Sequence, residues 1–247
     1  MLTLAILFFV ISLLYSTVGF GGGTSYIAAL SVSAISYVWI PKISLLCNLI
    51  VVTGGCYHYF KQGYFSKNLL MPFVLSSVPF AYLGGLYPIR EKFYYLLLTG
   101  ALLFCGVRIL FIKDRETSLP KPPPFGIALL VGAFLGALSG MVGVGGGIFL
   151  SPILINLGWA RSKNAAAVAS AFILLNSVAG LAGQFTKNPV MPDVQTCLPL
   201  FAAVIIGGQI GSRMGTHSRV SHSLIQKSTG LLTLMIGGKL LMQAIAG

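Results

Sequence analysis

Long apolar runs recur along the chain, separated by short segments that contain Gly, Pro or charged residues. A helix that crosses a bilayer needs about 20 predominantly apolar residues. The pattern predicts ten helical segments, at residues 2–18, 24–38, 40–60, 68–88, 92–112, 125–142, 148–158, 162–185, 197–215 and 223–246. We therefore expect an all-α integral membrane protein with about 8–10 membrane segments.

The chain divides into two similar halves. Residues 1–112 form a first predicted transmembrane repeat, residues 113–124 a polar, Pro-rich linker, and residues 125–247 a second transmembrane repeat. Both halves carry the same unusual motif, Gly-Phe-Gly-Gly-Gly at 19–23 and Gly-Val-Gly-Gly-Gly at 143–147. A short apolar segment follows each motif. Self-similarity of this kind indicates one helical unit used twice.

The segment after each Gly run is short for a membrane span. Residues 148–158 would extend about 16 Å as a helix, whereas the hydrocarbon core is about 30 Å thick. The segment either re-enters the membrane or crosses it as a tilted half-helix, and the sequence leaves both readings open. In both readings, the short segment and the helix before it together bring the chain back to the side of the membrane on which that half began. The other helices of each half then cross the membrane an odd number of times. This predicts two repeats of inverted topology.

The distribution of basic residues favours the inverted arrangement. In the inverted arrangement, one face of the membrane receives the larger set of basic residues: Lys61, Lys67, Arg108, Lys113, Arg115, Lys121, Arg161, Lys163, Arg213, Arg219 and Lys227. The other face keeps Lys42, Arg90, Lys92, Lys187 and Lys239. Parallel repeats would divide the basic residues evenly. Because cytoplasmic loops are enriched in Lys and Arg, the first face is predicted to be cytoplasmic, with both termini periplasmic or extracellular.

Composition excludes several classes of protein. Charged residues make up 8% of the chain and apolar residues 56%, too few ionised groups to cover a water-exposed surface. The net charge of +12 comes from residues between apolar segments, which is typical of loops at an anionic membrane surface rather than of a nucleic-acid face. The four Cys and three His show no metal-ligand spacing, so we expect no cofactor or metal.

The acidic residues also constrain the transported species. All four, Glu91, Asp114, Glu116 and Asp193, fall in loops or at segment edges. Carriers coupled to protons or sodium commonly place a carboxylate near the midplane of the membrane. The sequence therefore disfavours a cation substrate and carboxylate-based proton coupling.

The Gly runs are the strongest candidates for chemistry. Each Gly costs about 1 kcal/mol relative to Ala in a helix, so the helix is expected to open there. The next short helix would then present free amides and the positive end of its dipole, which suit an anion. The candidate substrate-binding residues are Gly21, Gly22, Gly23, Thr24, Ser25, Asn48, Gly145, Gly146, Gly147, Ser170 and Asn176. No catalytic residue is expected.

Packing is the competing explanation for these features. Small residues four apart let transmembrane helices approach closely. We favour packing for Gly132, Gly136 and Gly140, and for Gly207, Gly211 and Gly215. For the two Gly runs we favour a broken-helix site, because packing alone does not require three adjacent glycines. Asn48, Ser170 and Asn176 are polar residues in apolar helices, for which contact with a solute and interhelical bonding are equally plausible.

Three motifs resemble the sulfite exporter TauE/SafE family. They are residues 19–23, the sequence Gly-Val-Gly-Gly-Gly-Ile-Phe-Leu-Ser-Pro at 143–152, and Ala-Ala-Val-Ala-Ser at 166–170. The resemblance covers essentially the whole chain. It implies a bacterial inner-membrane carrier for small anions such as sulfite and sulfoacetate. The first half departs from the usual pattern, with Thr24 and Ser25 after the glycines and Cys47-Asn48 where an Ala/Thr-Ser pair is common, which leaves the substrate open.

The leading hypothesis is a secondary transporter, not an enzyme. It would export sulfite, sulfoacetate or a related organosulfur oxyanion by alternating access around a site between the two broken helices. A channel-like pore for a small anion or a neutral solute is the alternative, because the same helix ends would serve it without alternation. The expected partners are the small anion and the lipid bilayer, and the oligomeric state stays open, a homo-oligomer included.

Overall fold

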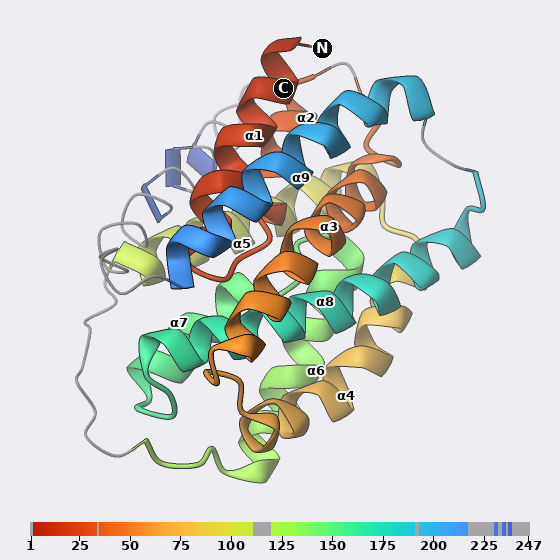
Figure 1. Ribbon diagram of the computed structural model, residues 1–247. Helices are drawn as coiled ribbons and strands as arrows, with labels where there is room; N and C mark the ends of the chain where they lie inside the picture. Colours follow the sequence, from red (N-terminus) through yellow and green to blue (C-terminus); the bar gives the residue numbers. More distant parts are fainter. Residues whose placement is uncertain are drawn as a thin grey trace.

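The computed structural model describes residues 2–33, 35–110, 120–190 and 193–216, and the short stretches 230–231, 234–235 and 237–238. Within these residues the fold is entirely helical (Figure 1). The helices are α1 (Leu2–Thr17), α2 (Gly23–Ser31), α3 (Ile40–Lys61), α4 (Lys67–Leu86), α5 (Glu91–Leu110), α6 (Phe125–Val142), α7 (Gly147–Asn156), α8 (Ser162–Lys187) and α9 (Val194–Thr216). The expected all-α class is confirmed. The tenth predicted segment, 223–246, lies mostly outside the described residues.

One helix, α2, is much shorter than its predicted segment. A helix was expected over 24–38, but α2 ends at Ser31. The hydroxyl of Ser31 donates to the carbonyl of Ile27, and that of Ser33 lies within bonding distance of the carbonyls of Ala29 and Leu30. Bonds from serine hydroxyls to main-chain carbonyls compete with continuation of a helix. The described residues that follow lie in turns and irregular backbone, although their hydropathy resembled that of a helix.

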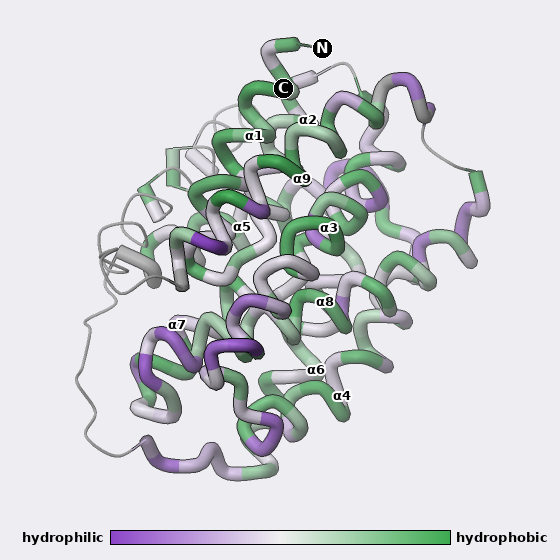
Figure 2. The backbone as a smooth tube through the Cα atoms, in the orientation of Figure 1, coloured by the Kyte–Doolittle hydropathy of each residue, from purple (hydrophilic) through white to green (hydrophobic). Residues whose placement is uncertain are grey.

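The surface is apolar, as a bilayer requires. Five helices in the described part are long and apolar enough to cross a membrane: α3, α4, α6, α8 and the Cys197–Gly215 portion of α9. The apolar helices α1 and α7 are shorter. Hydrophobic residues are distributed along the helices (Figure 2). Large side chains such as Leu130, Phe134 and Leu198 have more than half of their surface exposed. In water these side chains would be costly, whereas lipid solvates them.

Glycines let two pairs of helices pack closely. Helix α6 packs along α4, and α9 packs along α1. The contact glycines are Gly132, Gly136 and Gly140 on α6, and Gly207, Gly211 and Gly215 on α9. A Cβ at any of them would collide with a main-chain carbonyl or a serine hydroxyl of the partner helix. The packing interpretation of these two sets is therefore confirmed.

Helices α3 and α8 contact each other and run in opposite directions (Figure 1). Near the start of α8, the side-chain amide of Asn164 donates to the carbonyl of Tyr64, just past the end of α3, at 2.9 Å. At the other end, Lys42 in the first turn of α3 donates to the carbonyl of Asn188, just past the end of α8. These two helices carry Asn48 and Ser170 into the interior.

Candidate functional site

Both Gly runs separate a long helix from a short one. Helix α1 ends at Thr17 and α2 begins at Gly23, while α6 ends at Val142 and α7 begins at Gly147. Gly22 and Gly146, the residues before the short helices, have φ of 89° and 78°. A side chain disfavours this left-handed backbone by about 1–2 kcal/mol, so Gly is the residue that fits. The sequence thus places helix starts at both runs.

Asn48 lies between the two runs. Its Nδ2 donates to the carbonyl of Val144, in the second run, at 3.1 Å. The same nitrogen lies 2.6 Å from the place that a Cβ would take at Gly23 and 2.8 Å from that place at Gly145. Its Oδ1 faces Gly21 and is buried without a hydrogen-bond partner. One side chain therefore touches both runs, and only glycines leave room for it.

Each run is bound by one serine from the opposite half of the chain. Ser170 on α8 lies with its Oγ 2.9 Å from the carbonyl of Gly19 and 2.9 Å from that of Ala166 in its own helix. Ser44 on α3 lies with its Oγ 2.8 Å from the carbonyl of Gly143 and 3.2 Å from that of Gly23. A hydroxyl has one proton, so each serine donates to one carbonyl at a time. Sequence reasoning missed Ser44, whose position one helical turn before Asn48 was the available signal.

The other predicted residues have different surroundings. Thr24 is buried and its Oγ1 has no partner. The hydroxyl of Ser25 donates to that of Tyr15 at 2.7 Å, and Asn176 donates to the carbonyl of Phe172 in its own helix at 2.8 Å. Ser177, next to Asn176, is the residue that approaches the second run, with Oγ 3.3 Å from the Cβ position of Gly145. The contacts thus join Asn48, Ser170, Ser44 and Ser177 to the runs.

The region is closed and carries no ionised side chain among these residues. All eleven predicted site residues are buried. The region has two kinds of amide donor. They are the main-chain amides at the starts of α2 and α7 and the side-chain amide of Asn48. Helix starts and amide donors favour an anion. In the part of the chain that the structure describes, no group of three or more His, Cys, Asp or Glu residues is placed to hold a metal ion.

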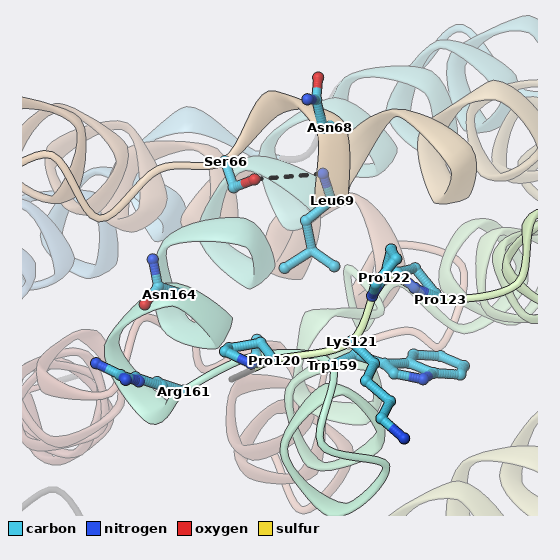
Figure 3. A pocket seen from close by; sticks show the side chains of 11 residues that line it. Ser66, Asn68, Leu69, Pro120, Lys121, Pro122, Pro123, Trp159, Arg161 and Asn164 are labelled. Atoms are coloured by element: carbon cyan, nitrogen blue, oxygen red, sulfur yellow. Dashed lines mark hydrogen bonds between the residues drawn. The ribbon is translucent and has the colours of Figure 1, made fainter. Parts of the chain in front are cut away.

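Two cavities lie toward opposite ends of the α3–α8 pair. One of about 420 Å³ is lined by the start of α4, residues 120–123 and the α7–α8 connection, with Lys121, Trp159 and Arg161 around it (Figure 3). The other, of about 200 Å³, is lined by the start of α3, the α4–α5 connection and the end of α8. Neither includes a residue of the Gly runs.

The sequence profile of the family described as "Sulfite exporter TauE/SafE" matches residues 4–240. The chain belongs to this family. It is 34% identical over 243 residues to a "probable membrane transporter protein" of Sinorhizobium fredii, covering 96% of this chain and 97% of that protein. Proteins with the same description in Methanocaldococcus jannaschii (28% identity, 75% of this chain, 72% of that one) and Xylella fastidiosa (23%, 87% and 86%) are also similar. No solved structure matches the chain.

Membership in this family supports a multi-pass membrane transporter, in agreement with the apolar helices. The relatives' names state transport without a substrate. The transported species therefore has to be inferred from the chemistry of the site and tested by experiment.

Proposed function

We propose that this protein exports a small oxyanion, of the sulfite or organosulfonate class, by alternating access around the region between the two Gly runs. The observation that carries the proposal is Asn48, whose amide touches both runs where two short helices begin. Amide donors and helix N-termini bind anions without a charged side chain. Such a site also releases its ligand readily, which a carrier requires.

We further propose that the two halves are inverted repeats. Three features support this arrangement. Corresponding helices α3 and α8 run in opposite directions. The glycine contacts of α6 with α4 have their counterpart in those of α9 with α1. Ser44 and Ser170 bind the carbonyls of Gly143 and Gly19, which are equivalent positions in the two runs. Inverted repeats around a midplane site are the architecture of many alternating-access carriers.

The driving force follows from the absence of acidic residues. In the described residues of α3, α4, α6 and α8 there is no Asp or Glu. We therefore propose movement down the electrochemical gradient of the anion, or exchange, rather than proton coupling through a carboxylate. A cell-negative potential would favour export by about 2.3 kcal/mol per charge per 100 mV.

The location of the protein completes the proposal. We place it in the bacterial inner membrane with both termini outside, because that orientation puts the larger basic set in the cytoplasm. Single cysteines introduced at Lys67 and at Lys92 test the orientation, since the proposed topology puts these positions on opposite faces of the membrane. In intact cells an impermeant thiol reagent should label the cysteine at 92 and spare the one at 67. The reverse labelling would contradict the proposed orientation.

Transport by the purified protein in liposomes is the direct test. We expect saturable uptake of radiolabelled sulfite or sulfoacetate, faster when the imposed potential attracts the anion. Sulfate serves as a comparison for size and charge. Flux that does not saturate would point to the channel-like alternative. No flux of any of these anions, with protein that remains folded, would refute the assignment of the substrate class.

A further inference from the structure

The cavity of about 200 Å³ contains two lysines. Lys42 and Lys187 both line it, together with Gln184 and two tyrosines, and none of its eleven lining residues is acidic. Lys42 was expected at a membrane surface, but its side chain is fully buried within α3. A buried charge is stable only when it is well paired or hydrogen-bonded. The position of this ammonium group therefore calls for an explanation.

The ammonium group of Lys42 contacts neutral groups. Its Nζ donates to the carbonyls of Asn188 and Val190, and it lies 5.0 Å from the ring centre of Trp39 and 4.8 Å from that of Phe185. Carbonyl oxygens and aromatic faces stabilise an ammonium group without neutralising its charge. The positive charge of Lys42 therefore remains available to a ligand in the cavity.

Lys187 adds a second positive charge at the same place. Its Nζ lies 3.4 Å from the carbonyl of Tyr87, and its charge repels that of Lys42. An anion between two like charges would relieve this repulsion. Because a water occupies about 30 Å³ in the liquid, the cavity has room for a small hydrated oxyanion but is smaller than a typical pocket for a drug-sized molecule.

The cavity adjoins the second Gly run. Pro41 lines it and also packs against Gly143, whose Cβ position lies 2.6 Å from the Cα of Pro41. Tyr94 lines it too, and its hydroxyl donates to the carbonyl of Val142 at 3.2 Å. A single layer of residues therefore separates the two lysines from the turn that begins the second Gly run.

We propose that this cavity is a second binding site for a small oxyanion, held between Lys42 and Lys187 on the path between the outer solution and the Gly runs. The inference rests on the proposed function for the direction of transport, but not for anion binding itself. The larger cavity at the other end of α3 and α8 also holds two basic residues, Lys121 and Arg161, and no acidic one. Each end of the proposed path thus offers positive charge.

Trp39 provides a direct probe, because its ring lies beside Lys42 and the chain has only two tryptophans. Trp159→Phe leaves Trp39 as the single fluorophore. Titration of this full-length variant in detergent with sulfite should change its fluorescence saturably. Neutral dimethyl sulfone and sodium chloride at matched ionic strength should not reproduce the change. Equal responses to sulfite and to matched chloride would mean ionic strength alone and would overturn the proposal.

Lysine variants of this single-tryptophan protein identify the site. Lys187→Gln should weaken sulfite binding about tenfold or more, as expected for loss of a bond to a charged group. Lys163→Gln is the matched control, since Lys163 is at the opposite end of the same helix and contacts Tyr64 instead. Lys42→Gln should act like Lys187→Gln, and the exposed Lys187 carries the test if the Lys42 variant does not fold. An unchanged titration in Lys187→Gln would overturn the proposal.

A variant of the Gly-run region separates this proposal from the proposed function. Asn48→Asp is expected to stop transport while the fluorescence response of Trp39 to sulfite persists. Loss of that response in the folded variant would show that Trp39 reports on the Gly-run region and would overturn the second site. Binding at Trp39 without flux in liposomes would refute export while leaving the cavity assignment intact.

Discussion

Replacing Asn48 by Asp tests the proposed site with almost no change in shape. The substitution exchanges one nitrogen for one oxygen on a side chain that touches both Gly runs. It removes the donor to the carbonyl of Val144 and places a negative charge where two helices begin. If the region binds an anion, the new carboxylate occupies its place and repels it.

The expected effects on folding and on binding differ in size. Loss of the bond to Val144 costs about 1–3 kcal/mol, because a buried carbonyl is left unpaired. Burying an ionised carboxylate costs several kcal/mol more, of which the helix starts return about 0.3–1 kcal/mol each. Repulsion between two unit charges 4 Å apart is about 4 kcal/mol at an effective dielectric constant of 20. Since 1.4 kcal/mol is tenfold, affinity should fall about a thousandfold in the protein that folds.

The assay is uptake of radiolabelled sulfite into liposomes, with thermal unfolding in detergent as the folding check. Asn48→Leu is the matched control, because it removes the same donor to the carbonyl of Val144 without adding a charge. The control should keep more of its sulfite affinity than Asn48→Asp. Normal sulfite affinity in folded Asn48→Asp would refute an anion site at Asn48.

Three further predictions concern the same framework. Gly136→Ala should destabilise the protein by about 1–3 kcal/mol and lower its unfolding temperature in detergent, because the added methyl group meets the carbonyl of Ser77. Gly126→Ala is the control and should leave the unfolding temperature unchanged, because the space around Gly126 is open. Gly146→Ala should insert normally yet lose sulfite flux, since φ of 78° costs a side chain about 1–2 kcal/mol, and wild-type flux would contradict this. Ser44→Ala should destabilise the protein by about 1–3 kcal/mol and slow transport, whereas equal unfolding temperatures would show that water replaces the hydroxyl.

Hydropathy was sufficient for most of the fold because lipid-spanning helices must be apolar throughout. Helix α3 was expected at 40–60 and spans Ile40–Lys61, and α6 was expected at 125–142 and spans Phe125–Val142. The segment at 24–38 was placed wrongly, since hydropathy does not register the serine hydroxyls that end α2 at Ser31. The glycine contacts of α6 and α9 were predictable from their spacing, but their partner helices were not.

The candidate site was only partly accessible from the sequence. Asn48 was singled out as a polar residue in an apolar helix, and its role in binding stays a prediction. Ser44 was missed because its bonding partner, Gly143, lies in the other half of the chain. Lys42 looked like a surface residue, since the two carbonyls and the ring of Phe185 that contact it are brought there only when α3 and α8 are packed. Long-range contacts of this kind leave no local pattern.

The cross-half bonds bear on how the proposed carrier would move. Each Gly run is bound by a serine of the opposite half, Ser170 to Gly19 and Ser44 to Gly143. If one half rocks against the other, these bonds and that of Asn48 to Val144 must break or exchange together. Ser44 already lies within bonding distance of Gly23 as well as Gly143, so it can exchange one carbonyl for the other without leaving a buried hydroxyl unpaired. We therefore expect the two runs to open in turn rather than independently, which is the behaviour of a carrier and not of a pore.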